Sequence, residues 1–106
     1  MQNALNALAE PRRRHILRLV CDQELAAGEI ASHFEVTRTA ISQHLTVLRG
    51  AGLVSERREG TRRLYRARPE GLVPLREFID DFWKDNLGRL QAAAEEEERR
   101  RRAPGN

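Results

Sequence analysis

Apolar side chains recur at helical intervals along most of this chain, and the interval changes only in one segment just past the middle. The clearest stripe consists of Ile41, Leu45 and Leu48, which stand at i, i+4 and i+7 of a predicted helix over residues 37–52. Thr37 can cap the start of this helix, and the glycines near its end can stop it because glycine readily adopts a left-handed conformation. The pattern therefore predicts a helix that packs one apolar side on a core.

Three shorter helices are predicted upstream, over residues 3–9, 11–21 and 25–34. The second begins at a proline, which is tolerated in the first turn of a helix. Only two residues separate the third helix from the helix over 37–52, so these two helices must pack at a steep angle. That arrangement is helix-turn-helix geometry.

The interval changes after Leu53. Residues 53–59 and 61–67 flank Gly60, the one residue there that is suited to a tight turn, and together they predict a β-hairpin. The tip of this hairpin carries four arginines, which are Arg57, Arg58, Arg62 and Arg63.

A long helix is predicted after Pro69, with an apolar face wider than one small core can cover. A second copy of the chain is the natural cover for this face, together with the apolar side of the first helix. We therefore predict a dimer interface that contains Leu5, Leu8, Leu75, Phe78, Ile79, Phe82, Trp83, Leu87 and Leu90. An inducer pocket at the aromatic residues is the less favoured reading, because no polar groups converge there.

The side of the 37–52 helix opposite its apolar stripe carries short hydrogen-bonding side chains and almost no acid. Such a face suits the major groove of DNA, where amide and guanidinium groups read base edges. An ordinary solvated surface is the plainer alternative. The hairpin arginines suit phosphate contacts, although charge at a hairpin also prevents edge pairing. The predicted DNA-contacting residues are Thr37, Arg38, Thr39, Ser42, Gln43, Thr46, Arg57, Arg58, Arg62 and Arg63.

Charge is unevenly placed along the 106 residues, although the net charge is only +3. Six arginines against two glutamates lie in residues 51–68, next to the proposed groove helix, which is an electrostatic footprint for phosphate. Residues 95–98 are glutamates that each precede an arginine by four positions, a favourable order on a helix. We predict one domain over 1–98 and a basic, disordered tail over 99–106.

Four motifs, in this order, resemble the ArsR family of winged-helix repressors. They are ALAEPRRRHILRLV, GEIASHF, TRTAISQHLTVLRGAGLV and RREGTRRLYRA. With the long helix that follows them, the resemblance extends over residues 4–90. The resemblance implies a mainly α fold with a small β-hairpin (α+β), a winged helix-turn-helix of about five helices and a two-stranded wing. It also implies a homodimer that pairs its terminal helices and represses transcription at a palindromic operator of double-stranded DNA.

Metal-sensing members of that family carry cysteine pairs near the helix before recognition, or His, Asp and Glu ligands on the last helix. The corresponding stretches here, ELAAGEIAS and DDFWKDNLGRL, contain neither cysteine nor histidine, so the chain resembles the branch without a recognised metal site. We predict no metal and no cofactor, and the inducer stays open, as does activation instead of repression.

The alternative function is a metal- or thiol-responsive sensor that uses Cys21, the histidines, or Asp80, Asp81 and Asp85. Against it, we expect Cys21 to be a partly buried small hydrophobe, and His44 to be structural, with one ring nitrogen bonded to backbone or phosphate. A winged helix that docks protein instead of DNA is a further alternative. An enzyme is not expected, because no nucleophile, base or phosphate loop can be assembled from the sequence.

The lone cysteine excludes an intrachain disulfide, which suits a reducing compartment. No apolar run approaches the roughly 20 residues of a membrane span, and no secretory signal opens the chain. We therefore expect a cytoplasmic protein without a membrane partner.

Overall fold

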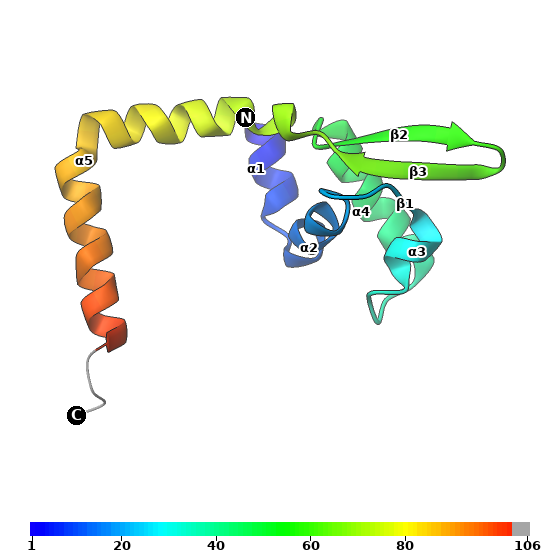
Figure 1. The fold of residues 1–106 in the computed structure, drawn as a ribbon, viewed down its shortest axis with the longest axis horizontal. Coiled ribbons are helices and arrows are strands. Elements are labelled where there is room, and N and C mark those ends of the chain that lie inside the picture. Colours follow the sequence, from blue (N-terminus) through cyan, green and yellow to red (C-terminus); the bar gives the residue numbers. More distant parts are fainter. Residues whose placement is uncertain (103–106) are drawn as a thin grey trace. The chain divides into compact units, whose positions relative to one another are not determined.

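The computed structural model describes residues 1–102 and divides the chain into two compact units, Met1–Leu75 and the part of the last helix from Arg76 onward. Figure 1 shows the succession of helices and strands. In chain order they are α1 (Gln2–Leu8), α2 (Pro11–Leu19), β1 (Leu25–Ala26), α3 (Ala27–Ala31), α4 (Arg38–Gly50), β2 (Val54–Glu59), β3 (Arg62–Ala67), the 3-10 helix η1 (Pro69–Leu72) and α5 (Val73–Arg102). The predicted mainly helical fold with a small hairpin is confirmed.

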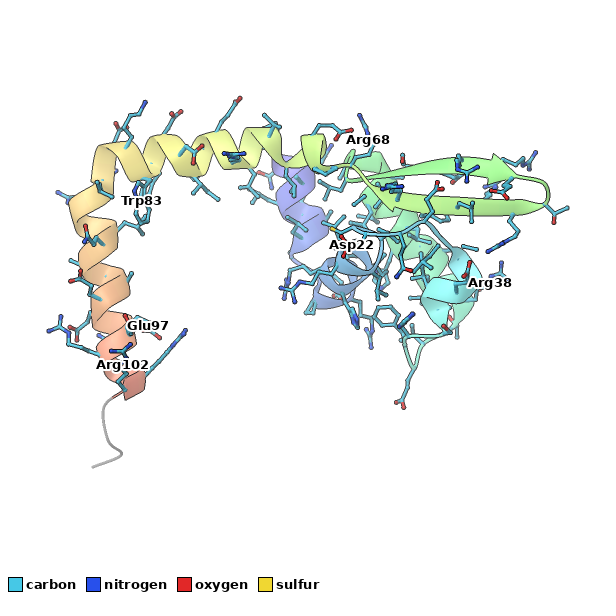
Figure 2. All side chains as sticks on the ribbon, viewed as in Figure 1. Asp22, Arg38, Arg68, Trp83, Glu97 and Arg102 are labelled. Atoms are coloured by element: carbon cyan, nitrogen blue, oxygen red, sulfur yellow. The ribbon has the colours of Figure 1, made fainter. Side chains whose placement is uncertain are left out.

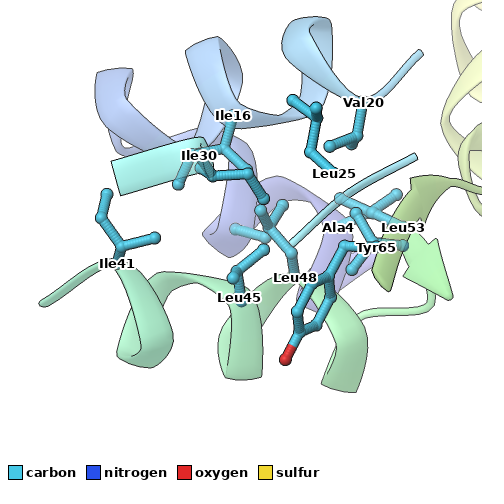
Figure 3. Packing of buried hydrophobic residues seen from close by; sticks show 12 residues of the cluster. Ala4, Ile16, Val20, Leu25, Ile30, Ile41, Leu45, Leu48, Leu53 and Tyr65 are labelled. Atoms are coloured by element: carbon cyan, nitrogen blue, oxygen red, sulfur yellow. The ribbon is translucent and has the colours of Figure 1, made fainter. Parts of the chain in front are cut away.

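The core of the first unit lies between the helices α1 to α4 and the base of the sheet (Figure 3). The predicted α4 stripe forms one side of it, because Ile41, Leu45 and Leu48 are all buried. Ile16 from α2 and Ile30 from α3 face this stripe and are also fully buried. Each such side chain stabilises the fold by about 1.5–3 kcal/mol relative to exposure, so the core fixes how α4 is seated.

Side chains at the helix starts satisfy backbone N–H groups, as the sequence predicted for α4. The Thr37 hydroxyl oxygen accepts a hydrogen bond from the N–H of Ala40 at 3.0 Å. Pro11 begins α2, and the Glu10 side chain before it accepts from the N–H of Arg12. Gly52, just after α4, has a φ of 75°, which is the left-handed stop that the sequence predicted.

The sheet has three strands in the order β1-β3-β2, not the two strands that were predicted. The hairpin of β2 and β3, which we call the wing (residues 54–67), turns at Gly60, whose φ is 63°. The prediction of a helix starting at Leu25 was wrong, because Leu25 and Ala26 form β1 and pair with Tyr65 and Leu64 of β3. This long-range pairing overrides the local helical pattern and leaves only five residues for α3.

Helix α5 has no buried residue within the described chain, despite its wide apolar face. Its backbone is non-helical at Asn86, where φ is −129° and ψ is 28°, so a kink interrupts it. It continues to Arg102, so the prediction of a disordered tail from residue 99 does not hold for 99–102, and residues 103–106 lie outside the described residues. Ion pairs to Glu96, Glu97 and Glu98 line this last stretch. None of the helices in residues 1–102 combines the length and apolar character that a membrane span requires.

Candidate nucleic-acid interface

The exposed side of α4 carries the polar residues that the sequence assigned to DNA. Thr39, Ser42, Gln43 and Thr46 are all exposed, and no acidic residue occurs anywhere in α4. The Thr46 hydroxyl donates to the carbonyl oxygen of Ser42 at 3.0 Å, so its proton is engaged inside the helix while its oxygen can still accept. The three other side chains remain open to hydrogen bonds from outside.

Thr37 and Arg38 stand at the start of this helix and are exposed as well. The Arg38 guanidinium lies beside Gly28 of α3. Arg38, which is labelled in Figure 2, has no carboxylate partner within residues 1–102. A free guanidinium at the first turn of a groove-facing helix can reach a base edge or a phosphate.

A hollow of about 490 Å³ lies between α4 and the wing. It brings Arg38 and Ser42 of α4 together with Arg62 and Arg63 of β3, which the sequence could assign only to separate elements. Ala26, Ala27 and Thr61 complete its lining. Three arginines line this hollow, and although Arg62 is paired with Glu29, the charges of Arg38 and Arg63 leave the hollow positive, which favours an anion.

The wing arginines differ in their surroundings, which the sequence did not indicate. Arg57 donates to both carboxylate oxygens of Glu24, at 2.7 and 2.9 Å, and also to Glu59 at 2.9 Å. Arg62 is paired with Glu29, whose carboxylate also accepts from the N–H of Ala26.

Arg58 and Arg63 are less engaged. Arg63 has only a long ion pair to Glu56, at 3.7 Å, and Arg58 has no carboxylate partner in the described part of the chain. The four arginines that the sequence treated as one group therefore form two pairs with different contacts. Sequence reasoning did not identify Glu24 and Glu29, the two acids that bind Arg57 and Arg62 and so distinguish them from Arg58 and Arg63.

A second contact that sequence reasoning missed joins the end of α4 to the wing. Arg49 of α4 donates to Glu56 of β2 at 2.6 Å, and the Glu56 side chain is only 19% exposed. Burial raises the pKa of the neighbouring Tyr65 hydroxyl, and the charge of Glu56 adds to this increase. Glu56 thus fixes the wing base against the helix whose polar face lies at the candidate interface.

His44, on the flank of α4, is half-buried next to α2. Its Nδ1 lies 3.4 Å from the Arg13 guanidinium, which also donates to the carbonyl oxygens of Ala7 at 2.7 Å and Asn6 at 3.0 Å. Burial lowers the pKa of His44, and the Arg13 charge lowers it further, so Nδ1 can accept from Arg13 as part of a neutral ring. The predicted partner, backbone or phosphate, is replaced by this guanidinium.

Cys21 is exposed, so the expectation of a partly buried cysteine was wrong. It lies two residues after the end of α2, in a short turn before β1 that leaves its side chain at the surface. Within residues 1–102, no three His, Cys, Asp or Glu side chains gather closely enough to hold a metal ion.

The side chains assigned to a dimer interface lie in both units. In the first unit Leu5 is exposed, while Leu8 and Leu75 are partly buried. In the second unit large apolar side chains are about half exposed along α5, and the rings of Phe78 and Phe82 stack at 6.3 Å between centroids. These exposed residues are Phe78, Ile79, Phe82, Trp83 and Leu87, and Leu90 is partly buried.

The chain is similar to known proteins over the regions that carry this candidate interface. The model of the family described as "Bacterial regulatory protein, arsR family" matches residues 10–56, which contain α2 to α4 and the start of β2. The regulator Rv2034 of Mycobacterium tuberculosis is 48% identical over 80 residues, which cover 76% of this chain and 75% of that protein.

Two further relatives are named for opposite effects on transcription, one as a repressor and one as an activator. The transcriptional repressor SdpR of Bacillus subtilis is 40% identical over 60 residues, covering 57% of this chain and 67% of SdpR. The transcriptional activator HlyU of Vibrio cholerae is 47% identical over 55 residues, covering 52% of this chain and 51% of HlyU.

Among solved structures, the homodimeric winged helix-turn-helix DNA-binding domain of Mb0332 from Mycobacterium bovis is similar, with a TM-score of 0.63 and 35% identity. The match covers 81% of this chain and 80% of that one.

Proposed function

Because this chain belongs to the ArsR family of bacterial regulatory proteins, and is therefore a DNA-binding transcriptional regulator and not an enzyme, we propose that it represses transcription as a homodimer on a palindromic operator. The observation that carries this proposal is the exposed, acid-free face of α4 that continues into the arginine-lined hollow beside the wing. A polyanion with a groove wide enough for a helix fits both parts of that surface.

Base reading is assigned to the middle of the α4 face. The Gln43 amide can both donate and accept, so it can pair with the N6 and N7 edge of adenine. Arg38, at the first turn, can reach a guanine or a phosphate, and Thr37, Thr39, Ser42 and Thr46 can accept or donate single hydrogen bonds around it. Phosphate contacts would come from the wing and would fix the register of α4 in the groove.

The apolar face of α5 supports the dimer. Aromatic side chains bury about 150–250 Å² each when fully covered, so the half-exposed Phe78, Phe82 and Trp83 leave roughly 200–400 Å² of apolar surface on one chain. Ile79 and Leu87 enlarge this surface to the size of the largest patches that monomers expose, about 300–600 Å². A second copy would cover it, and the similar domain of Mb0332 is described as homodimeric.

A two-fold dimer imposes a symmetric operator. Two copies of α4 would enter successive major grooves about 34 Å apart, one turn of B-DNA. Repression would follow when such a site overlaps a promoter, because the bound dimer then excludes the polymerase.

Selection of bound duplexes from a random library, by the full-length protein in competitor DNA, tests this function. We expect an inverted repeat with half-site centres one turn apart, and a dimer in sedimentation equilibrium. Transcription in vitro from a promoter that carries the selected site should fall as protein is added. Failure to enrich any sequence would refute sequence-specific binding, and a rise in transcript would indicate an activator.

A further inference from the structure

The Glu24–Arg57 pair spans the sheet from one edge to the other. Arg57 lies in β2, and Glu24 directly precedes β1, while β3 lies between these two strands. Figure 1 shows β1 beside β3 at the base of the wing. Neighbouring strands are about 4.8 Å apart, so the two side chains cross roughly 10 Å of sheet to meet. The contact connects residues that are 33 positions apart in the chain.

The backbone pairing beneath this contact is short. Strand β1 has only two residues, and its register with β3 consists of Leu25 with Tyr65 and Ala26 with Leu64. The N–H of Ala67 adds one hydrogen bond to the carbonyl oxygen of Val20 at 2.9 Å, and further contacts that hold the wing are side-chain ion pairs, Arg49–Glu56 to α4 and Arg62–Glu29 to α3. A side-chain contact that reaches past β3 to β2 restricts rotation of the wing about its base in a way that the two-residue ladder cannot.

Among the ion pairs of the wing within residues 1–102, this pair is the one with bidentate geometry. Both guanidinium nitrogens of Arg57 that face Glu24 donate, one to each carboxylate oxygen, which is the bidentate arrangement that favours Arg over Lys. The Glu24 side chain is 25% exposed, and the hydrogen bond from Arg57 lowers the pKa of its carboxyl group. Glu59 holds the same guanidinium at 2.9 Å.

The opposite face of the wing is arranged differently. The register pairs Arg58 with Arg63, so two like charges stand directly across from each other on adjacent strands. Such a pair is destabilising in the free protein. It becomes favourable when an anion lies against both side chains.

We propose that Glu24 and Arg57 are positioning residues that hold the wing at the angle required for DNA, and that Arg58 and Arg63 make the phosphate contacts of the wing. This assignment rests on the DNA-binding function proposed above. It removes Arg57 from the DNA-contacting set, because Arg57 would have to leave two carboxylates to reach a phosphate. It gives Glu24, an acid near a DNA-binding surface, a favourable role in binding.

The test compares E24Q, R57Q, the double variant and the charge swap E24R/R57E on a selected duplex between about 50 and 200 mM salt. We expect each single variant to weaken binding roughly two- to fivefold, the range of an exposed ion pair, and the double variant to be no weaker than either. The charge swap should restore affinity. The slope of log K against log salt should stay at the wild-type value in all four.

Two further variants serve as controls. R58Q should flatten the salt slope by about one, because it removes a phosphate contact. E35Q removes an exposed acid just before α4 that has no ion pair within residues 1–102, and so reports the effect of removing a negative charge alone. An affinity gain in E24Q beyond that in E35Q would overturn the proposal, as would a flatter slope in R57Q.

Amide hydrogen exchange in the free protein separates this inference from the proposed function. E24Q and R57Q should speed exchange of the β2 and β3 amides to the same extent, and the double variant should add nothing. If the wild type binds no duplex, the proposed function fails, yet unchanged exchange in both single variants would still overturn the role of the pair. Faster exchange with undiminished DNA affinity would also overturn it.

Discussion

Replacing Gly71 with alanine should destabilise the protein by a mechanism that the structure defines closely. Gly71 belongs to η1, the turn that leads from the wing into α5. A Cβ at this position would lie 2.1 Å from the carbonyl oxygen of Gly52, 2.9 Å from its carbonyl carbon and 3.1 Å from Leu53 Cδ2. Gly71 does not have a positive φ, so an alanine would fit its backbone conformation, and only the close approach opposes it.

The size of the effect follows from the atoms involved. Carbon and carbonyl oxygen approach to about 3.3 Å in the closest common contacts, so the backbone at residue 71 must move by roughly 1 Å. The obstructing atoms are backbone, and no rotamer change can relieve them. Inserted methyl groups cost about 1–3 kcal/mol, and we expect the upper part of that range here. For a domain of this size, about 2–3 kcal/mol lowers Tm by roughly 10–20 °C.

Gly50→Ala is the matched control. Gly50 is the last residue of α4, and a Cβ there would meet nothing within 4 Å. Alanine at such a position stabilises by about 0.4–1 kcal/mol, mainly because it restricts the unfolded chain. We therefore expect the two glycine substitutions to shift Tm in opposite directions.

Thermal unfolding followed by circular dichroism, at one fixed protein concentration, measures both variants. The concentration must be fixed because subunit association stabilises the folded state by mass action. A G71A protein that melts at or above the wild-type temperature would refute the reasoning, since it would mean that the turn at η1 relaxes without cost.

Three further outcomes are expected. Gln43→Ala should lower operator affinity by about 1–3 kcal/mol and relax preference at one base pair, measured on single-base operator variants, and an unchanged profile would remove Gln43 from the base-reading set. Phe82→Asp places a charge on a side chain that is 48% exposed, and should dissociate the dimer in sedimentation equilibrium; a dimer that persists would place the interface elsewhere. Because the pKa of His44 is lowered in the folded protein, the folded state favours the neutral ring more than the unfolded state does. The contribution of His44 to the free energy of unfolding is therefore complete above pH 6.5 and is lost as the pH falls below that value. Urea unfolding between pH 7.5 and 5 should show a steeper loss of stability in the wild type than in H44Q, and equal losses would contradict the assignment.

Local patterns were sufficient to predict the elements that carry the interface. The spacing of Ile41, Leu45 and Leu48 fixes which side of α4 is buried, and therefore which side is exposed. Gly60 fixes the hairpin turn because few other residues accept its conformation. Each of these two signals comes from residues that are close together in the chain, so each can be recognised without knowledge of the fold.

The features that the sequence did not predict depend on residues far apart in the chain. Strand β1 exists because Leu25 and Ala26 meet β3, about forty residues later, and nothing in their neighbours indicates a strand. The acids Glu24 and Glu29 belong to the same segment, so the contacts of Arg57 and Arg62 could not be anticipated either. Charge alone predicted that all four wing arginines contact phosphate.

The sequence nevertheless contained part of the information that divides the four wing arginines into two pairs. A two-residue turn at Gly60 and Thr61 places Glu59 opposite Arg62, and that register then places Arg58 opposite Arg63. Side chains alternate between the faces of a strand, so Arg57 and Arg58 must point to opposite faces. The hairpin register therefore divides the four arginines between two faces, but only the fold shows that Glu24 meets Arg57 and Glu29 meets Arg62, while Glu56, on the face of Arg58 and Arg63, bonds closely to Arg49. Arg58 and Arg63 stand across from each other on the face where Glu56 is bonded to Arg49, so this like-charged pair costs stability in the free protein, and the phosphate contacts that we propose would offset the cost.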